Sequence, residues 1–151
     1  METVKILHCA DIHIGALESF LGEEAAKRRF ETLLTFEKIV SIAVEQEVEI
    51  VAIAGDLFDS NHIEESFISA VFKKISEEKS IKFVFSAGNH DPLNSESPFS
   101  KENVPENLFV LPTKDSVITF EDIGVRVYGR SFESVYLSGE AVTVFNGEIK
   151  M

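Results

Sequence analysis

Cysteine and tryptophan are nearly absent from this sequence: among 151 residues there is one cysteine, Cys9, and no tryptophan. A single cysteine cannot form an internal disulfide, so a reducing compartment is expected, with Cys9 as a small core residue. No apolar run approaches the roughly 20 residues that span a bilayer. The amino-terminal stretch also lacks the basic and apolar segments of a signal peptide. These absences predict a cytoplasmic protein.

Positive charge is scarce as well. Fourteen lysines and arginines stand against 26 aspartates and glutamates, for a formal net charge of −12. An acidic surface repels phosphate backbones, which excludes nucleic-acid binding by bulk electrostatics. The one basic cluster, residues 27–29, falls in a helical pattern and is expected on its solvated face. Phosphate chemistry here would therefore need positive charge from a bound metal ion.

The apolar residues that are present predict an α/β domain. Short apolar runs at 4–10, 49–54 and 81–87 are typical of buried strands, whereas apolar residues recur at helical spacing in 24–47 and 64–79. Alternation of such strands with helices predicts a mostly parallel sheet flanked by helices. With no linker composition visible, one domain over residues 1–151 is expected.

The composition of the sequence changes after residue 91. A loop rich in proline and small polar residues covers 91–107. Four short strand-like runs follow, and we expect them to form an antiparallel β segment: "LFVL" (108–111), "SVITFED" (116–122), "GVRVYGRSF" (124–132) and "AVTVF" (141–145). A hairpin is predicted to turn through Asp122, Ile123 and Gly124.

Each of the three predicted parallel strands ends in a polar cluster. These clusters are "DIH" (11–13), "GDLFD" (55–59) and "GNHD" (88–91). The carboxyl ends of parallel strands share one edge of the sheet, so the clusters are expected to converge. Taken singly, each is more typical of a solvated turn or a helix cap. Three in register favour a binding site.

The chemistry of the converging side chains indicates a metal site. The set contains carboxylates, two histidines and an asparagine but no cationic residue, so the carboxylates would repel one another in the absence of a positive ion. Mixed oxygen and nitrogen ligands suit manganese, iron or zinc better than calcium. Asp56, in the middle cluster, is placed to bridge two ions about 3.5–4 Å apart, as in two-metal phosphoesterases.

The three clusters resemble the first three signature motifs of the calcineurin-like metallophosphoesterases. The longer stretches "AGDLFDSN" (54–61) and "VRVYGRSF" (125–132) are most similar to the branch that contains the SbcD-like DNA double-strand-break repair nucleases. The resemblance covers residues 4 to about 133. It implies the first half of the αββα sandwich of that superfamily and the activity of a DNA-repair exonuclease.

The resemblance also implies roles for single residues. The implied metal ligands are Asp11, His13, Asp56 and Asn89. Asp11 and His13 would hold the first of two divalent ions, Mn²⁺ before Mg²⁺, Fe²⁺ or Zn²⁺, and Asp56 would bridge both. His90 would face the scissile phosphate, with Asp59 holding its imidazole.

The sequence departs from the family pattern in its later histidines. Family members carry three more after the third motif, whereas residues 92–151 contain none. Of the other two histidines, His8 is expected in the core along the first strand, and His62 near the rim of the site. We therefore expect an N-terminal portion of a longer nuclease, with a weakened second metal site.

Two other functions fit the same sequence. The missing histidines favour a catalytically deficient fragment that acts as an interaction module. The acidic balance favours a phosphoesterase acting on small phosphodiesters or phosphoproteins rather than on DNA. For the nuclease, the resemblance implies DNA as substrate, a homodimer, and a coiled-coil ABC-type ATPase (SbcC-like) as partner. Dimer contacts are expected in 62–79, although its apolar residues Phe67, Ile68, Val71 and Phe72 could equally be core.

Overall fold

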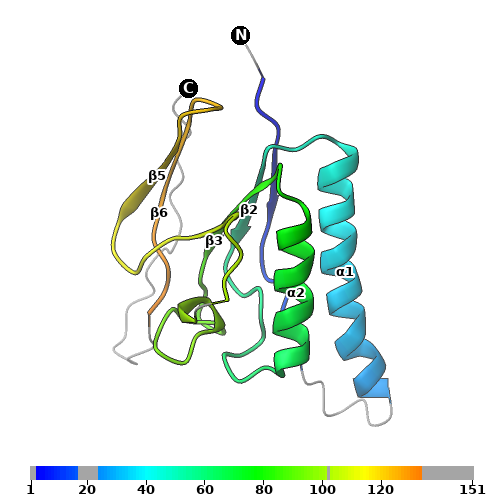
Figure 1. The fold of residues 1–151 in the computed structure, drawn as a ribbon. Coiled ribbons are helices and arrows are strands. Elements are labelled where there is room, and N and C mark those ends of the chain that lie inside the picture. Colours follow the sequence, from blue (N-terminus) through cyan, green and yellow to red (C-terminus); the bar gives the residue numbers. More distant parts are fainter. Residues whose placement is uncertain (1–2, 17–23, 102, 134–151) are drawn as a thin grey trace.

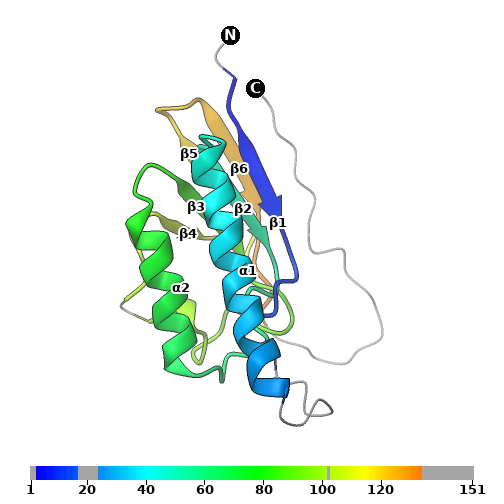
Figure 2. The ribbon, with the colours of Figure 1, turned by 90° about the vertical axis from the view of Figure 1, so that its right-hand side faces the viewer.

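The computed structural model describes residues 3–16, 24–101 and 103–133, and the predicted α/β class is confirmed (Figure 1). Four strands form one parallel sheet in the order β1-β2-β3-β4: β1 (Ile6–Cys9), β2 (Ile50–Ala54), β3 (Lys82–Ser86) and β4 (Leu108–Val110). Two helices, α1 (Ala25–Glu45) and α2 (Glu65–Glu77), lie side by side against one face of this sheet (Figure 2).

The central strands are apolar because both of their faces are covered. In β2 and β3 the branched and aromatic residues are almost all buried, as expected for a parallel sheet between layers. Helix α2 buries one stripe of residues at helical spacing. Each residue of this stripe is at most 9% exposed: Phe67, Ile68, Val71, Phe72 and Ile75. The four α2 residues that sequence left open between dimer contact and core are therefore core residues.

Helix α1 is less deeply embedded than its sequence suggests. Leu33, Phe36 and Val40 are buried, but the side chains of Phe30 and Leu34 are 53% and 47% exposed. A helix packed between a sheet and a neighbouring helix buries only one stripe, and Phe30 and Leu34 lie beyond it. The helix ends at Glu45, and two residues later Glu47 takes a positive φ of 54° while the Val48 amide donates to the Ala43 carbonyl.

The basic cluster on α1 also differs from the expectation. Lys27 and Arg28 are exposed as predicted, whereas the Arg29 side chain is only 17% exposed. Its Nε donates to the Gly15 carbonyl at 2.9 Å, and its guanidinium lies 4.9 Å from the centre of the Phe67 ring. Arg29 is mostly covered because its guanidinium both bonds a loop carbonyl and lies over an aromatic face.

The chain after residue 91 was only partly predicted. "LFVL" does not join an antiparallel segment: β4 pairs with β3 in parallel, with Phe83 opposite Leu108 and Phe85 opposite Val110. The long 91–107 connection gives the chain enough length to cross over, which parallel pairing requires. The hairpin is confirmed, since β5 (Ser116–Phe120) and β6 (Val125–Gly129) pair antiparallel. The "AVTVF" run lies outside the described residues.

The hairpin covers the face of the sheet opposite the helices (Figure 1). Its inward side chains form a second apolar cluster with the sheet: Ile50, Val84, Leu111, Phe120 and Val125. The sheet is thus sandwiched between a helical layer and a β layer, which cover its two faces. Among the described residues, no helix is both long and apolar enough to cross a membrane.

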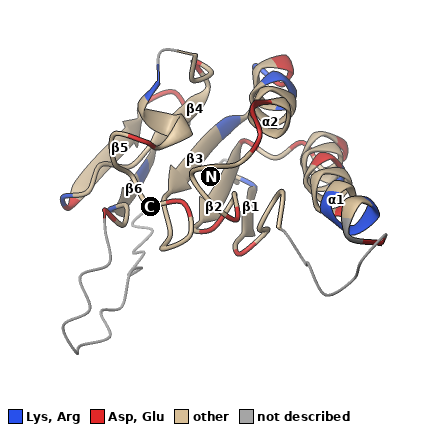
Figure 3. Cartoon of the chain, turned by 90° about the horizontal axis from the view of Figure 1, so that it is seen from below, with Lys and Arg blue, Asp and Glu red and all other residues tan. Residues whose placement is uncertain are grey.

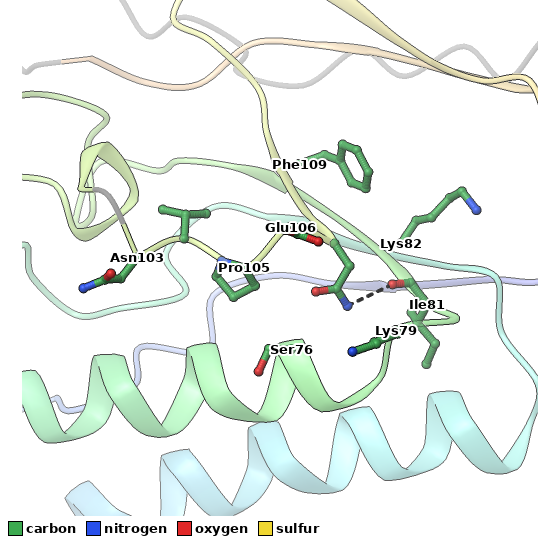
Figure 4. A pocket seen from close by; sticks show the side chains of 10 residues that line it. Ser76, Lys79, Ile81, Lys82, Asn103, Pro105, Glu106 and Phe109 are labelled. Carbon is green, nitrogen blue, oxygen red and sulfur yellow. Dashed lines mark hydrogen bonds between the residues drawn. The ribbon is translucent and has the colours of Figure 1, made fainter.

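The amino ends of the strands carry a structural cap rather than polar clusters. The Asn107 side-chain amide donates to the carbonyls of Ile75, Glu78 and Ile81 at 2.8, 3.1 and 3.2 Å. The bond to Ile81 is drawn in Figure 4. These bonds satisfy carbonyls at the carboxyl end of α2 and tie it to the start of β3. An open cavity of about 720 Å³ lies beside this cap, lined partly by Lys79. The predicted polar clusters lie at the opposite end of the strands.

Candidate metal centre

The first two polar clusters are joined by main-chain hydrogen bonds beyond the ends of β1 and β2. The Asp11 amide donates to the Gly55 carbonyl at 3.1 Å, and the His13 amide donates to the Asp56 carbonyl at 2.9 Å. Ile14 and Phe58 continue this pairing as an isolated bridge. Seen from below, the loops that follow the strands carry acidic segments (Figure 3). The two loops therefore keep a fixed register, so their side chains stand at one edge.

Three of the predicted site residues share an unusual backbone conformation. Asp11, His13 and Asp56 have φ angles of 52°, 51° and 51°. These angles lie in the left-handed region, which residues other than glycine rarely adopt. Among the described residues only Glu47 shares this property outside glycine, and it terminates a helix. Such strain persists where the surrounding structure enforces it and is concentrated at functional sites.

The same three residues form a possible metal-binding group. Each offers one ligand atom, and these atoms lie within 4.8 Å of one another. Asp56 is 7% exposed, and Nε2 of His13 lies 3.9 Å from its Oδ2. Two carboxylates and an imidazole at this spacing fit a divalent cation that accepts oxygen and nitrogen ligands. The residues present therefore fit a divalent metal ion.

Asp59 lies between two histidines. Its Oδ1 is 3.1 Å from Nδ1 of His13 and 3.7 Å from Nδ1 of His90, and its carbonyl oxygen is 3.1 Å from the same His90 nitrogen. Sequence assigned the Asp59 carboxylate to His90 alone. In the structure the carboxylate is nearer to His13, and the main chain of Asp59 is nearest to His90. With its proton on Nδ1, His13 keeps Nε2 available as a ligand atom.

The third cluster reaches the site through its main chain. The His90 amide donates to Oδ1 of Asp56 at 2.9 Å. The His90 ring stands edge-on to the His13 ring, with 4.7 Å between their centres. Asn89, the preceding residue, is exposed in the same loop. The structure thus brings together the side chains of five predicted site residues: Asp11, His13, Asp56, Asp59 and His90. The sixth, Asn89, directly precedes His90 in the chain.

Asp91 received no individual role from the sequence, although it belongs to the third cluster. It is fully buried, and its carboxylate accepts main-chain hydrogen bonds from the second cluster. Burial raises the pKa of this carboxyl group, and the charge of Asp56 acts in the same direction, whereas the Gly88 and Phe58 amides oppose them. Nothing in the sequence separates Asp91 from a solvated loop aspartate, because two of its three amide partners come from 33 and 35 residues away.

The two remaining histidines lie outside this group. His8 was expected in the core but is exposed, because side chains alternate along β1 and only Leu7 and Cys9 pack against the helical side. His62 is 77% exposed and lies 3.7 Å from Glu96 in an ion pair on the surface. Neither belongs to a group of possible metal ligands among the described residues.

The sequence matches a known protein family over most of its length. Residues 4–148 match the family described as calcineurin-like phosphoesterase. The DNA double-strand break repair protein Mre11 of Methanopyrus kandleri is 30% identical over 108 residues, covering 70% of this chain and 23% of that protein. Mre11 of Sulfolobus acidocaldarius is 30% identical over 133 residues, covering 85% of this chain and 33% of that protein. The chain therefore spans a third or less of the length of these relatives.

A solved structure, the Pseudomonas putida nuclease MPE, aligns over 95% of this chain and 82% of that chain. The TM-score is 0.47 and the sequence identity 17%.

Proposed function

The chain belongs to the calcineurin-like phosphoesterase family, and from that membership we propose that it is a metal-dependent phosphodiester hydrolase. The substrate class that we propose is DNA, with an exonuclease of the SbcD-like repair type as the specific activity. The observation that carries the proposal is the convergence of Asp11, His13 and Asp56, each held at positive φ, with His90 beside them. Further support comes from relatives that are named as DNA double-strand break repair proteins.

In this proposal the side chains divide the work. Asp11, His13 and Asp56 would hold one divalent ion, and Asp56 and Asn89 would contribute to holding a second. When bound, the ions supply Lewis-acid activation of the phosphate. Proton delivery and the positioning of the histidine rings are carried out by residues of the chain itself.

His90 is the proposed general acid. Its side chain is 45% exposed, so its ring can meet a substrate. Nδ1 lies 3.1 Å from the Asp59 carbonyl oxygen and donates to it in the matching tautomer. In the imidazolium form, which carries a proton on both ring nitrogens, Nε2 can deliver its proton to the leaving oxygen while Nδ1 keeps its own. Asp59 keeps the His13 and His90 rings in place through its carboxylate and its carbonyl.

The finer assignments are proposals of the same kind. We assign Mn²⁺ as the metal, because mixed carboxylate and imidazole ligands suit it, and the cytoplasm as location, because a single cysteine implies a reducing environment. For the full-length protein, a homodimer and a coiled-coil ABC-type ATPase are the proposed partners. Because Phe67, Ile68, Val71 and Phe72 are buried, a dimer would have to use other residues.

Two alternatives each have an observation in their favour. The absence of histidine from residues 92–151 favours a catalytically deficient interaction module. The net charge of −12 favours small phosphodiesters over duplex DNA. Both are separated from the nuclease by the same experiment.

The test is Mn²⁺-dependent hydrolysis of bis(p-nitrophenyl) phosphate and of linear duplex DNA, with Asp56→Asn and His90→Ala as inactivating variants. Cleavage of both substrates, abolished in both variants, supports the nuclease. Cleavage of the small diester alone selects the second alternative, and no cleavage of either selects the interaction module. His62→Ala is the matched control, because this exposed histidine lies outside the site.

A further inference from the structure

Asp91 is a fully buried carboxylate whose hydrogen-bond partners are main-chain amides. Oδ1 accepts from the amides of Asp56 at 3.2 Å and Gly88 at 2.8 Å, and Oδ2 accepts from the amide of Phe58 at 3.1 Å. A buried carboxylate is costly unless its charge is compensated, and hydrogen bonds to amides provide that compensation. The cost is tolerated here only because the three bonds are made together.

These amides belong to two different loops at the edge of the sheet. Asp56 and Phe58 lie in the loop after β2, and Gly88 lies in the loop after β3. A single carboxylate therefore fixes the distance between the two loops. The fit leaves no spare room, since a Cβ on Gly88 would stand 2.1 Å from Oδ1 of Asp56.

A second bond runs in the opposite direction. The Asp56 amide donates to Asp91, while the carboxylate of Asp56 accepts from the His90 amide at 2.9 Å. Each loop thus contributes one aspartate whose carboxylate binds an amide of the other loop. Asp56 is held at both ends: its main chain by Asp91 and its side chain by His90. The remaining oxygen, Oδ2, is the one that faces Nε2 of His13.

We propose that Asp91 is a positioning residue for the metal centre: it fixes Asp56 at positive φ, so that the Asp56 carboxylate stands ready for the ion. The inference rests on the proposed function, because it takes Asp56 as a metal ligand. Asp91 itself is not a ligand, because its carboxylate is fully buried and both of its oxygens are engaged by amides.

The variants separate positioning from charge. Asp91→Asn keeps the size of the side chain, but its NH₂ group must face an amide donor where an oxygen stood. Asp91→Glu keeps the charge but moves it by one methylene. Ser97→Ala is the structural control, because buried Ser97 also accepts a main-chain amide, that of Phe99, elsewhere in the fold.

The measurement is Mn²⁺ affinity by calorimetry, with amide hydrogen exchange recorded on the same proteins. Asp91→Asn and Asp91→Glu should each bind Mn²⁺ about 10–100-fold more weakly, the loss typical of residues that support metal ligands. Exchange should accelerate at Asp56, Phe58 and Gly88 but not in β2 and β3. Ser97→Ala should lose stability while keeping wild-type affinity.

Several results would overturn the inference. These are wild-type affinity in Asp91→Asn, full recovery of affinity in Asp91→Glu, or an equal loss in Ser97→Ala. If Asp91→Asn does not fold, Asp91→Ser replaces it, because a small hydroxyl introduces no obligatory donor clash. If the wild-type chain binds no Mn²⁺, the proposed function fails. In that case the positioning role is tested by hydrogen exchange alone. An unchanged exchange rate of the Asp56 amide in the Asp91 variants would refute it.

Discussion

The carboxylate of Asp59 lies 3.1 Å from Nδ1 of His13 and 3.7 Å from Nδ1 of His90. One side chain thus contacts a proposed metal ligand and a proposed general acid. Because the shorter contact is to His13, Asp59 is placed to support metal binding as well as proton transfer. Sequence reasoning considered only the second of these roles.

Replacing Asp59 should therefore weaken metal binding. Asp59→Ala removes the partner of His13 Nδ1, and we expect Mn²⁺ affinity to fall by about 10–100-fold. Asp59→Asn keeps an oxygen that can accept the same hydrogen bond, so its loss should be smaller. Calorimetric titration of both variants measures the order. If both bind Mn²⁺ as the wild type does and only turnover falls, then Asp59 acts through His90 alone.

Gly88→Ala should disturb the same centre by steric contact. The new Cβ would stand 2.1 Å from Oδ1 of Asp56 and 2.6 Å from its main-chain nitrogen, so the two loops must separate. We expect a loss of about 1–3 kcal/mol in the free energy of unfolding, typical of overpacking, together with weaker Mn²⁺ binding. Urea unfolding and calorimetry measure the two effects.

Gly124→Ala is the matched control for that variant. Gly124 has a φ of +66° in the hairpin turn, and a Cβ there would meet nothing within 4 Å. Its alanine variant should lose about 1–2 kcal/mol through left-handed strain alone, with Mn²⁺ affinity unchanged. Equal loss of affinity in both variants would mean that affinity follows global stability rather than the geometry around Asp56.

The parts of the fold that were predictable depend on short stretches of sequence. The three parallel strands, both helices and the β5–β6 hairpin follow from local hydrophobic spacing and turn residues. The convergence of Asp11, His13 and Asp56 was also predictable, because parallel strands place their carboxyl ends together. In these cases the local sequence pattern and the topology of the sheet agree. The elements and the convergence of the three residues could therefore be predicted without the tertiary structure.

The parts that were missed depend on contacts between distant residues. Whether β4 pairs in parallel depends on the path of a long loop, which carries no periodic signal. Arg29 is buried because Gly15 offers a carbonyl, and His8 is exposed because β1 presents that face away from the helices. Asp91 resembles a loop residue until its amide partners are seen. Each error is a tertiary effect that overrides a sound local expectation.

The depth of α1 can be tested with one substitution at two positions. Phe36 is fully buried, whereas Phe30, on the same helix, is 53% exposed. Phe36→Ala should cost about 3–5 kcal/mol because it leaves a cavity in the core. Phe30→Ala should change stability by only about 0.5 kcal/mol, as is usual at surface positions. Comparable losses in urea unfolding would mean that α1 is packed against something on its outer side.

Cys9 should make stability depend on alkaline pH. Burial raises the pKa of its thiol from 9.0 to about 11. Between these values the unfolded chain releases the proton while the folded chain retains it, so the folded state binds more protons there. Stability from this group is therefore fully present below pH 9 and is lost as pH rises through about 11.

The measurement is urea unfolding between pH 8 and 11.5, for the wild type and for Cys9→Ala. The difference between their free energies of unfolding isolates the effect of the thiol from that of other groups that titrate at alkaline pH. The wild-type free energy of unfolding should fall more steeply with pH than that of the variant. Alkylation by iodoacetamide gives an independent reading, because only the thiolate reacts. The folded protein should react slowly at pH 8.5 and faster as pH approaches 11, whereas the urea-unfolded chain should react readily at pH 8.5. Rapid alkylation of the folded protein at pH 8.5 would contradict the raised pKa of the Cys9 thiol.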